Sequence, residues 1–145
     1  MIKLFDPYIS NEEREIAAKV IKSKFWASGA GTNYVKKFEG NFCKYVGSKD
    51  CIAVSNGTAA LHLALSLFDI KNKEVLVPSL TFVSSVSSIV HNGGKPVFVD
   101  VDPNTLCIDT LDMEKKISKK TGAIVTVDFA GMPCDINNIK KIAND

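Results

Sequence analysis

A short segment in the middle of the chain has the residue types that bind an anion. Residues 54–60 read VSNGTAA and join an apolar run to a helical pattern. The first N–H groups of a helix have no intrahelical partner, so those of Gly57, Thr58 and Ala59 are predicted to be unpaired. Glycine allows close approach, the Thr58 hydroxyl adds a donor, and the helix dipole contributes about +0.5 charge. The segment predicts an oxyanion site, or else only a turn plus an N-cap within Asn-Gly-Thr.

An aromatic ring follows the next apolar run. Residues 78–82 read PSLTF, and there too the run passes into a helical pattern. Phe82 and the Gly57 turn should therefore lie at the same edge of a sheet, where α/β folds bind ligands. Phe82 could cover a flat cofactor. Taken alone, it is more simply explained as an ordinary core phenylalanine.

The elements that must position these residues are βαβ units. From Lys49 onward short apolar runs alternate with helical patterns, which is typical of a largely parallel sheet. No run alternates with polar residues, so each strand is expected to be buried on both faces. The helix from Thr58 is apolar nearly all round, which predicts an interior position. The expected strands are 51–54, 75–77, 96–99 and 123–127, and the expected helices are about 58–68, 82–92, 111–118 and 136–144.

Two further helices are expected before this region. Ser10 and Glu13 have capping-box spacing, which predicts an amphipathic helix that ends near Ser23. Thr32 is placed to cap a second helix that stops at Gly47. We therefore predict amino-terminal helices with a glycine-rich loop over residues 1–48 and a partial α/β domain of order βαβαβαβα over residues 49–145.

Composition excludes several classes of protein. The chain has 145 residues, a net charge of +2 and 46% hydrophobic residues, as expected for a soluble α/β domain. It has no apolar run of signal-peptide or membrane-spanning length, which favours a cytoplasmic location and no membrane partner. The lysines are interspersed with acids, so nucleic-acid binding is not expected. The four cysteines form no C-x-x-C pair, which favours buried thiols over a disulfide or a metal site.

With these features the sequence resembles the DegT/DnrJ/StrS family of pyridoxal-phosphate-dependent nucleotide-sugar aminotransferases. The likeness follows one order through nearly the whole chain. The resemblance implies a three-layer α/β sandwich with a mostly parallel sheet, like the amino-terminal part of the large domain of fold type I transferases. The blocks that carry it are 26–29 (WASG), 55–65 (SNGTAALHLAL), 78–82 (PSLTF), 96–102 (PVFVDVD) and 127–135 (VDFAGMPCD).

The resemblance also implies roles for the candidate residues at the cofactor. Gly57 and Thr58, with Ala59 behind them, would hold the phosphate of pyridoxal phosphate. Phe82 would stack on its pyridine ring, which replaces the core position considered above.

On the substrate side, Ser28 and Gly29 would lie near the sugar nucleotide, and residues 128–131 would approach the active site. Many relatives have a histidine where this chain has Asp128, so the resemblance does not carry a role over to this residue.

The reaction that the resemblance implies is transfer of an amino group to a keto-sugar nucleotide in polysaccharide or glycoconjugate biosynthesis. The amino donor would be an amino acid, with glutamate expected, and the enzyme would be at least a homodimer. The Schiff-base lysine, and the acid that pairs with the pyridine nitrogen, are expected beyond Asp145, so we assign no catalytic residue and expect these 145 residues to be an inactive part. Some relatives replace that lysine by histidine and dehydrate instead. A non-catalytic anion-binding or regulatory remnant of the fold stays open as an alternative.

Overall fold

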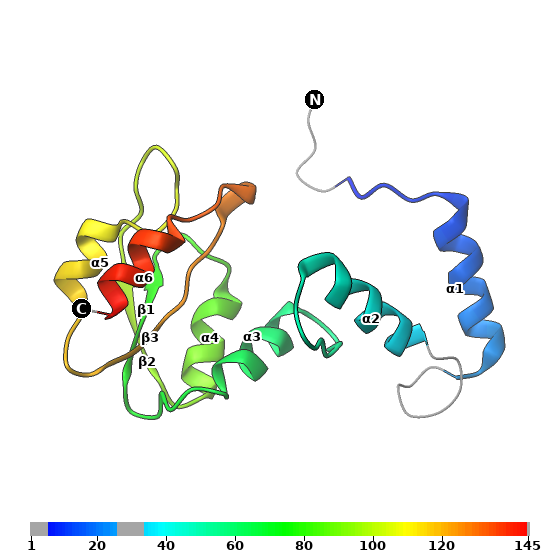
Figure 1. Ribbon diagram of the computed structural model, residues 1–145, viewed down its shortest axis with the longest axis horizontal. Helices are drawn as coiled ribbons and strands as arrows, with labels where there is room; N and C mark the ends of the chain where they lie inside the picture. The colour runs from blue at the N-terminus through cyan, green and yellow to red at the C-terminus, as the bar shows by residue number, and fades with distance from the viewer. Residues whose placement is uncertain (1–5, 26–33, 145) are drawn as a thin grey trace. The chain divides into compact units, whose positions relative to one another are not determined.

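The computed structural model describes residues 6–25 and 34–144, and the chain divides into two compact units, 1–53 and 54–145. The first unit contains helices α1 (Asn11–Ser23) and α2 (Tyr34–Val46) (Figure 1). The predicted capping box is confirmed, because the Ser10 side chain accepts from the Glu12 N–H and the Glu13 carboxylate accepts from the Ser10 N–H. The predicted cap at Thr32 lies outside the described residues.

The second unit is built around three parallel strands in the order β2-β1-β3. The strands are β1 (Glu74–Pro78), β2 (Lys95–Val99) and β3 (Thr121–Ile124). The helices are α3 (Gly57–Leu65), α4 (Val83–His91), α5 (Thr110–Lys116) and α6 (Ile136–Asn144), with a 3-10 turn, η1 (Phe129–Gly131), between β3 and α6.

Helices cover both faces of this sheet, because alternate residues of the central strand β1 point to opposite sides. Leu76 packs with Met113 of α5 and Ile139 of α6. On the other face, Val75 and Val77 pack in a cluster that includes residues of α3 and α4. Figure 1 shows the two helix pairs on either side of the strands. The predicted three-layer α/β fold with a parallel sheet is confirmed.

A small polar network attaches α5 to the end of β2. The Asp112 carboxylate accepts from the Asp100 N–H at 2.8 Å and from Lys116 Nζ at 2.6 Å, and Lys116 Nζ also donates to the Phe98 carbonyl at 2.9 Å. The hydrogen bond from the Asp100 backbone, and then that from Lys116, lower the pKa of Asp112. This network fixes α5 at the point where β2 ends.

The predicted strand at 51–54 is wrong. No strand forms there among the described residues, the side chain of Ile52 is 72% exposed, and the Ala53 N–H donates to Glu39 Oε1 at 2.9 Å. An apolar run becomes a strand only beside a neighbour that accepts its backbone hydrogen bonds, and the described residues offer none. The run at 123–127 is only partly confirmed, since β3 ends at Ile124.

The prediction that the apolar helix lies in an interior is also wrong for the described structure. Within α3 only Leu65 is buried, while Leu63 is exposed, as are Leu67 and Phe68 just after the helix. α3 packs mainly against α4, and Leu65 at its end joins the cluster around Val75 and Val77. The sequence pattern reports the apolar character of a helix and not which surface covers it.

Candidate functional site

The start of α3 presents two unpaired backbone donors. Asn56 is the N-cap, and its Oδ1 accepts from the Ala59 N–H at 2.9 Å. Among the described residues no acceptor pairs with the N–H of Gly57 or Thr58, and both residues are exposed. The expectation of an unpaired N–H is therefore wrong for Ala59 and agrees with the structure for the other two. Asn56 is the residue that the anion-site interpretation passed over, although the preference for asparagine at an N-cap identifies it.

The space beside the Gly57 Cα is open. A Cβ placed on Gly57 would have no heavy atom within 4 Å apart from its chain neighbours. Gly57 has no left-handed backbone angle, so a glycine here is not needed for the turn itself. These groups fit a phosphate. The two N–H groups and the Thr58 hydroxyl can donate hydrogen bonds to it, and the positive end of the helix dipole attracts its charge.

Two contacts fix the direction of α3 relative to α4. Ser88 Oγ donates to the Thr58 carbonyl at 3.5 Å, and Asn92 Nδ2 donates to the His62 carbonyl at 3.1 Å. Each contact joins residues that are 30 positions apart in the sequence. Because this offset stays the same along both helices, the two helices run in the same direction. Because α4 follows the carboxyl end of β1, α4 begins at the carboxyl edge of the sheet, and α3 runs in the same direction from a start beside the middle of α4.

Phe82 lies at this edge as the N-cap residue of α4, without a side-chain capping bond. Its side chain is 74% exposed, so it belongs to neither core cluster of the described residues. The contact between Thr58 and Ser88 sets Gly57 level with Ser87, about 6 Å along the helix axis from the first turn of α4. The ring of Phe82 is therefore available to a flat group whose phosphate lies at the start of α3.

The loop after β3 contributes Asp128 at the same edge. Its Oδ1 accepts from the Cys134 N–H at 3.0 Å, so the carboxylate holds its own loop in shape. The loop contains η1, in which Ala130 and Gly131 have left-handed backbone angles, φ 52° and 84°. The arrangement makes Asp128 a positioning residue for residues 128–134.

Two of the four cysteines are buried below this loop. Cys107 and Cys134 are 5% and 6% exposed, and their thiols donate to the carbonyls of Met132 and Val127. Burial, and then hydrogen bonding with Cys107 and Asp128, raises the pKa of Cys134 to about 12. This thiol therefore stays protonated and is a poor nucleophile. Cys43 and Cys51, in contrast, are only half-buried free thiols.

The remaining predictions concern the substrate-side residues, metal ions and membrane-spanning helices. Ser28 and Gly29 lie outside the described residues. Nowhere in residues 6–25 and 34–144 do three or more His, Cys, Asp or Glu side chains gather as a metal ion would require. Within the same ranges, no helix is long and apolar enough to cross a bilayer.

A parallel sheet with helices packed on both faces defines the class of α/β domains, which bind ligands at the carboxyl ends of their strands. Within that class, the chain belongs to the DegT/DnrJ/EryC1/StrS aminotransferase family, whose model matches residues 7–145.

Comparisons with individual proteins agree with this membership. The chain is 40% identical over 143 residues to GDP-perosamine synthase from Escherichia coli O157:H7, covering 98% of this chain and 39% of that protein. It is 40% identical over 133 residues to dTDP-3-amino-3,6-dideoxy-alpha-D-galactopyranose transaminase from Aneurinibacillus thermoaerophilus, covering 91% and 36%. The sugar aminotransferase Spr1654 from Streptococcus pneumoniae, solved in a PLP form, superimposes with a TM-score of 0.87 at 29% identity, covering 97% and 36%. The chain therefore spans little more than a third of the length of these relatives.

Proposed function

We propose that this chain forms the phosphate-binding and ring-binding part of a pyridoxal-phosphate-dependent aminotransferase that acts on a keto-sugar nucleotide. The observation that carries the proposal is the pair of unpaired N–H groups at Gly57 and Thr58, on the helix that packs beside α4, where the exposed ring of Phe82 stands at the start. The two named relatives act on sugars carried by GDP and dTDP, which supports a nucleotide-linked substrate.

Each residue has a distinct task in this proposal. The N–H groups of Gly57 and Thr58 and the Thr58 hydroxyl hold the phosphate, with Ala59 behind them, already engaged by Asn56. Phe82 covers one face of the pyridine ring and excludes water from it.

On the substrate side, Ser28 and Gly29 contact the sugar nucleotide. Asp128 fixes the loop that closes the same edge of the sheet.

Bound pyridoxal phosphate supplies an aldehyde and an electron-withdrawing ring that let an amino group pass from an amino acid, here glutamate, to the keto-sugar. The lysine that holds this aldehyde and moves the proton, and the acid that pairs with the ring nitrogen, are assigned to residues outside 1–145. On this proposal the 145 residues bind cofactor without turning over substrate. The complete enzyme is a cytoplasmic homodimer that serves polysaccharide or glycoconjugate biosynthesis.

Binding of the phosphate is tested by nuclear magnetic resonance on the chain itself. Pyridoxal phosphate should shift the amide signals of Gly57 and Thr58, whereas pyridoxal without phosphate should leave them in place. Thr58→Val removes one hydrogen bond to a charged group, worth about 1.5–3 kcal/mol, and should weaken binding roughly 10- to 100-fold. Ser66→Ala, at the far end of α3, is the matched control and should bind as the unmodified chain does.

A non-catalytic anion-binding remnant would pass that test as well, so a second measurement separates the two functions. The chain and the complete product of its reading frame are treated with pyridoxal phosphate and borohydride, and their masses are determined. A covalent adduct on a single lysine of the longer protein alone supports the aminotransferase. Phosphate binding without such an adduct in either protein favours the remnant.

A further inference from the structure

The two ends of the strands carry opposite charge. The turns that lead into β1, β2 and β3 are residues 66–73, 92–95 and 117–120, and they contain five lysines and one acid, Asp69. The segments that follow the strands, residues 79–82, 100–109 and 125–135, contain five aspartates and no lysine or arginine. The unit therefore has a directed electrostatic field, with its positive side at the amino ends of the strands. We call this side the basic edge, and its lysines are Lys71, Lys73, Lys95, Lys119 and Lys120.

Backbone hydrogen bonds hold the three turns of the basic edge side by side. The Lys95 N–H donates to the Lys73 carbonyl at 2.8 Å, and the Glu74 N–H donates to the Lys120 carbonyl at 2.9 Å. Adjacent strands are about 4.8 Å apart, so lysines from three neighbouring strands fall within a strip about 10 Å wide. The basic edge is therefore one continuous surface, although its lysines come from separate parts of the sequence.

Most of the charge at the basic edge is not neutralised. Lys73 forms an ion pair with Asp69 at 3.1 Å. The ammonium groups of the other four lysines have no ion-pair or hydrogen-bond partner among residues 6–25 and 34–144, and all four side chains are exposed. The remaining acid at this edge, Glu74, accepts a hydrogen bond from Ser118 Oγ at 2.6 Å. A strip of unpaired ammonium groups attracts an anionic surface.

Two exposed apolar side chains stand beside these lysines. Asn92, just after α4, contacts His62, so α3 ends at the same side of the sheet as α4 does. Leu67 and Phe68 follow α3, and their side chains are 81% and 59% exposed. Lysines next to a leucine and an aromatic ring are typical of surfaces that bind at the interface of a lipid bilayer. The basic edge has no arginine, which is the residue that nucleic-acid sites use most for specific base contacts.

We propose that the basic edge binds the surface of an anionic lipid bilayer. The ammonium groups are attracted to the negative head groups, and Leu67 and Phe68 enter the boundary between head groups and acyl chains. The same surface repels the aspartates at the other ends of the strands, so the unit binds in one orientation and its carboxyl edge faces the water. Such a contact needs no membrane-spanning run, so the lack of one in the sequence does not argue against it.

The test is cosedimentation of the complete product of the reading frame with lipid vesicles. The protein should bind vesicles of equal parts phosphatidylcholine and phosphatidylserine and should not bind vesicles of phosphatidylcholine alone. Binding should weaken with added salt, because the screening length falls from about 30 Å at 0.01 M to about 8 Å at 0.15 M. Absence of binding to the anionic vesicles overturns the proposal. The readout needs no cofactor, so it stands or falls separately from the proposed activity.

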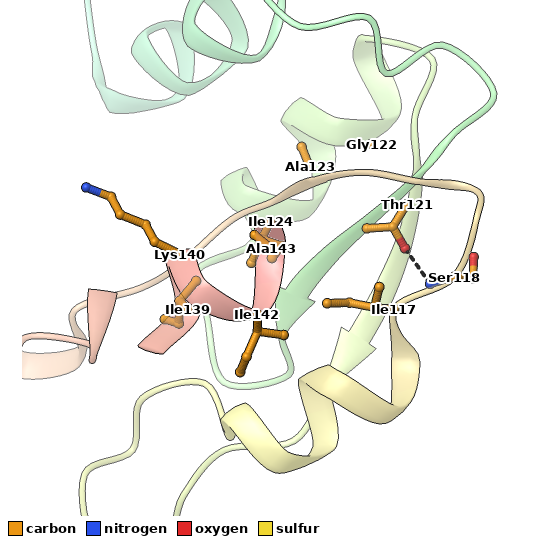
Figure 2. A pocket seen from close by; sticks show the side chains of 10 residues that line it. All are labelled: Ile117, Ser118, Thr121, Gly122, Ala123, Ile124, Ile139, Lys140, Ile142 and Ala143. Carbon is orange, nitrogen blue, oxygen red and sulfur yellow. Dashed lines mark hydrogen bonds between the residues drawn. The ribbon is translucent and has the colours of Figure 1, made fainter. Parts of the chain in front are cut away.

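A matched pair of variants identifies the surface that binds. The double change Lys119→Gln and Lys120→Gln should weaken vesicle binding roughly 30-fold, since each lysine near an anionic surface contributes about 5-fold. The control is Lys140→Gln with Lys141→Gln, which removes the same charge from exposed positions of α6. Figure 2 shows Lys140 directed away from Thr121, the residue that follows the Lys119–Lys120 pair. The control should bind nearly as the unmodified protein does, and equal losses for the two variants overturn the proposal.

The alternative partner of a basic surface is a soluble polyanion. Heparin and duplex DNA are therefore titrated against the same variants. Binding of either that depends on Lys119 and Lys120, without binding to the anionic vesicles, overturns the proposal in favour of such a partner.

Tryptophan fluorescence tests the orientation. Phe68→Trp places a reporter at the basic edge, and Leu111→Trp places one at the start of α5, near the carboxyl edge, where Leu111 is 69% exposed. Emission is taken as the difference from the unmodified protein. Anionic vesicles should shift the emission of Phe68→Trp to shorter wavelength, because the ring leaves water, and should leave that of Leu111→Trp unchanged. A shift for Leu111→Trp, or none for Phe68→Trp, overturns the proposed orientation.

Discussion

Replacing Asn56 by aspartate should weaken phosphate binding while leaving the helix intact. Asn56 Oδ1 caps the Ala59 N–H at 2.9 Å, and aspartate caps a helix as well as asparagine does. The new carboxylate would lie next to the N–H groups of Gly57 and Thr58, which we propose as the phosphate site. Asn56→Asp therefore separates the capping role of this residue from the electrostatics of the site.

The expected size of the effect follows from the geometry. An anion on the N–H groups of Gly57 and Thr58 would lie roughly 5 Å from the new carboxylate, since adjacent Cα atoms are about 3.8 Å apart. Coulomb repulsion over that distance in a water-like dielectric is about 0.8 kcal/mol per unit charge. A phosphate monoester carries about 1.5–2 negative charges, so binding should fall by about 1–2 kcal/mol, or roughly 10-fold.

Calorimetric titration with pyridoxal phosphate and with inorganic phosphate measures this loss, and urea unfolding measures stability. Asn56→Ser is the matched control, because serine caps the helix without adding charge. The loss for Asn56→Asp should shrink as salt is added, since the site is exposed. If Asn56→Asp binds both ligands as tightly as Asn56→Ser, the anion does not lie at the start of α3 and the reasoning is refuted.

Three further predictions concern other residues. Asp112→Asn should make the free energy of unfolding less sensitive to acid. The pKa of Asp112 is lowered in the folded state, so its carboxylate contributes stability above its ordinary pKa of 3.8. This contribution is lost as the pH falls from 3.8 through the lowered pKa. Unfolding curves that show the same acid sensitivity for the variant would contradict this role. Ala130→Val should lower the free energy of unfolding by about 1–2 kcal/mol, because a β-branched residue is strained at φ 52°, whereas Ala130→Gly should not. Equal urea midpoints for the two variants would speak against strain at this position. Cys134 should resist alkylation at pH 8 in the folded protein and react in urea, because its pKa is raised to about 12. Mass mapping that finds Cys134 modified before unfolding would refute its burial as a thiol.

Local signals in the sequence predicted the elements that depend on local interactions. The capping box at Ser10 and Glu13 predicted the start of α1, and the apolar runs at 75–77 and 96–99 predicted the central strand β1 and its neighbour β2. The helix beginning at Ile136 was predicted with both its bounds. In each case the interactions that define the element lie within a few residues of it or within one βαβ unit.

The predictions that failed depend on a distant partner. The run at 51–54 has the composition of a strand but no neighbour among the described residues, so its Ala53 N–H finds Glu39 instead. At the candidate site, the N–H groups of Gly57 and Thr58 have no partner among the described residues, as the sequence predicted, whereas Asn56 takes the N–H of Ala59. An asparagine before a helix start favours such a cap, and a capped N–H is no longer available to a ligand.

The two contacts between α3 and α4 set a fixed length at the candidate site. Because Ser88 meets Thr58 and Asn92 meets His62, the start of α3 cannot slide along α4 without breaking both hydrogen bonds. The distance from the Gly57 amide to the Phe82 backbone is therefore set before any ligand arrives. A molecule that reaches both must have its anionic group and its flat ring separated by that length. The helix pair therefore selects ligands by size. Little conformational entropy is lost on binding, because the two helices are already fixed.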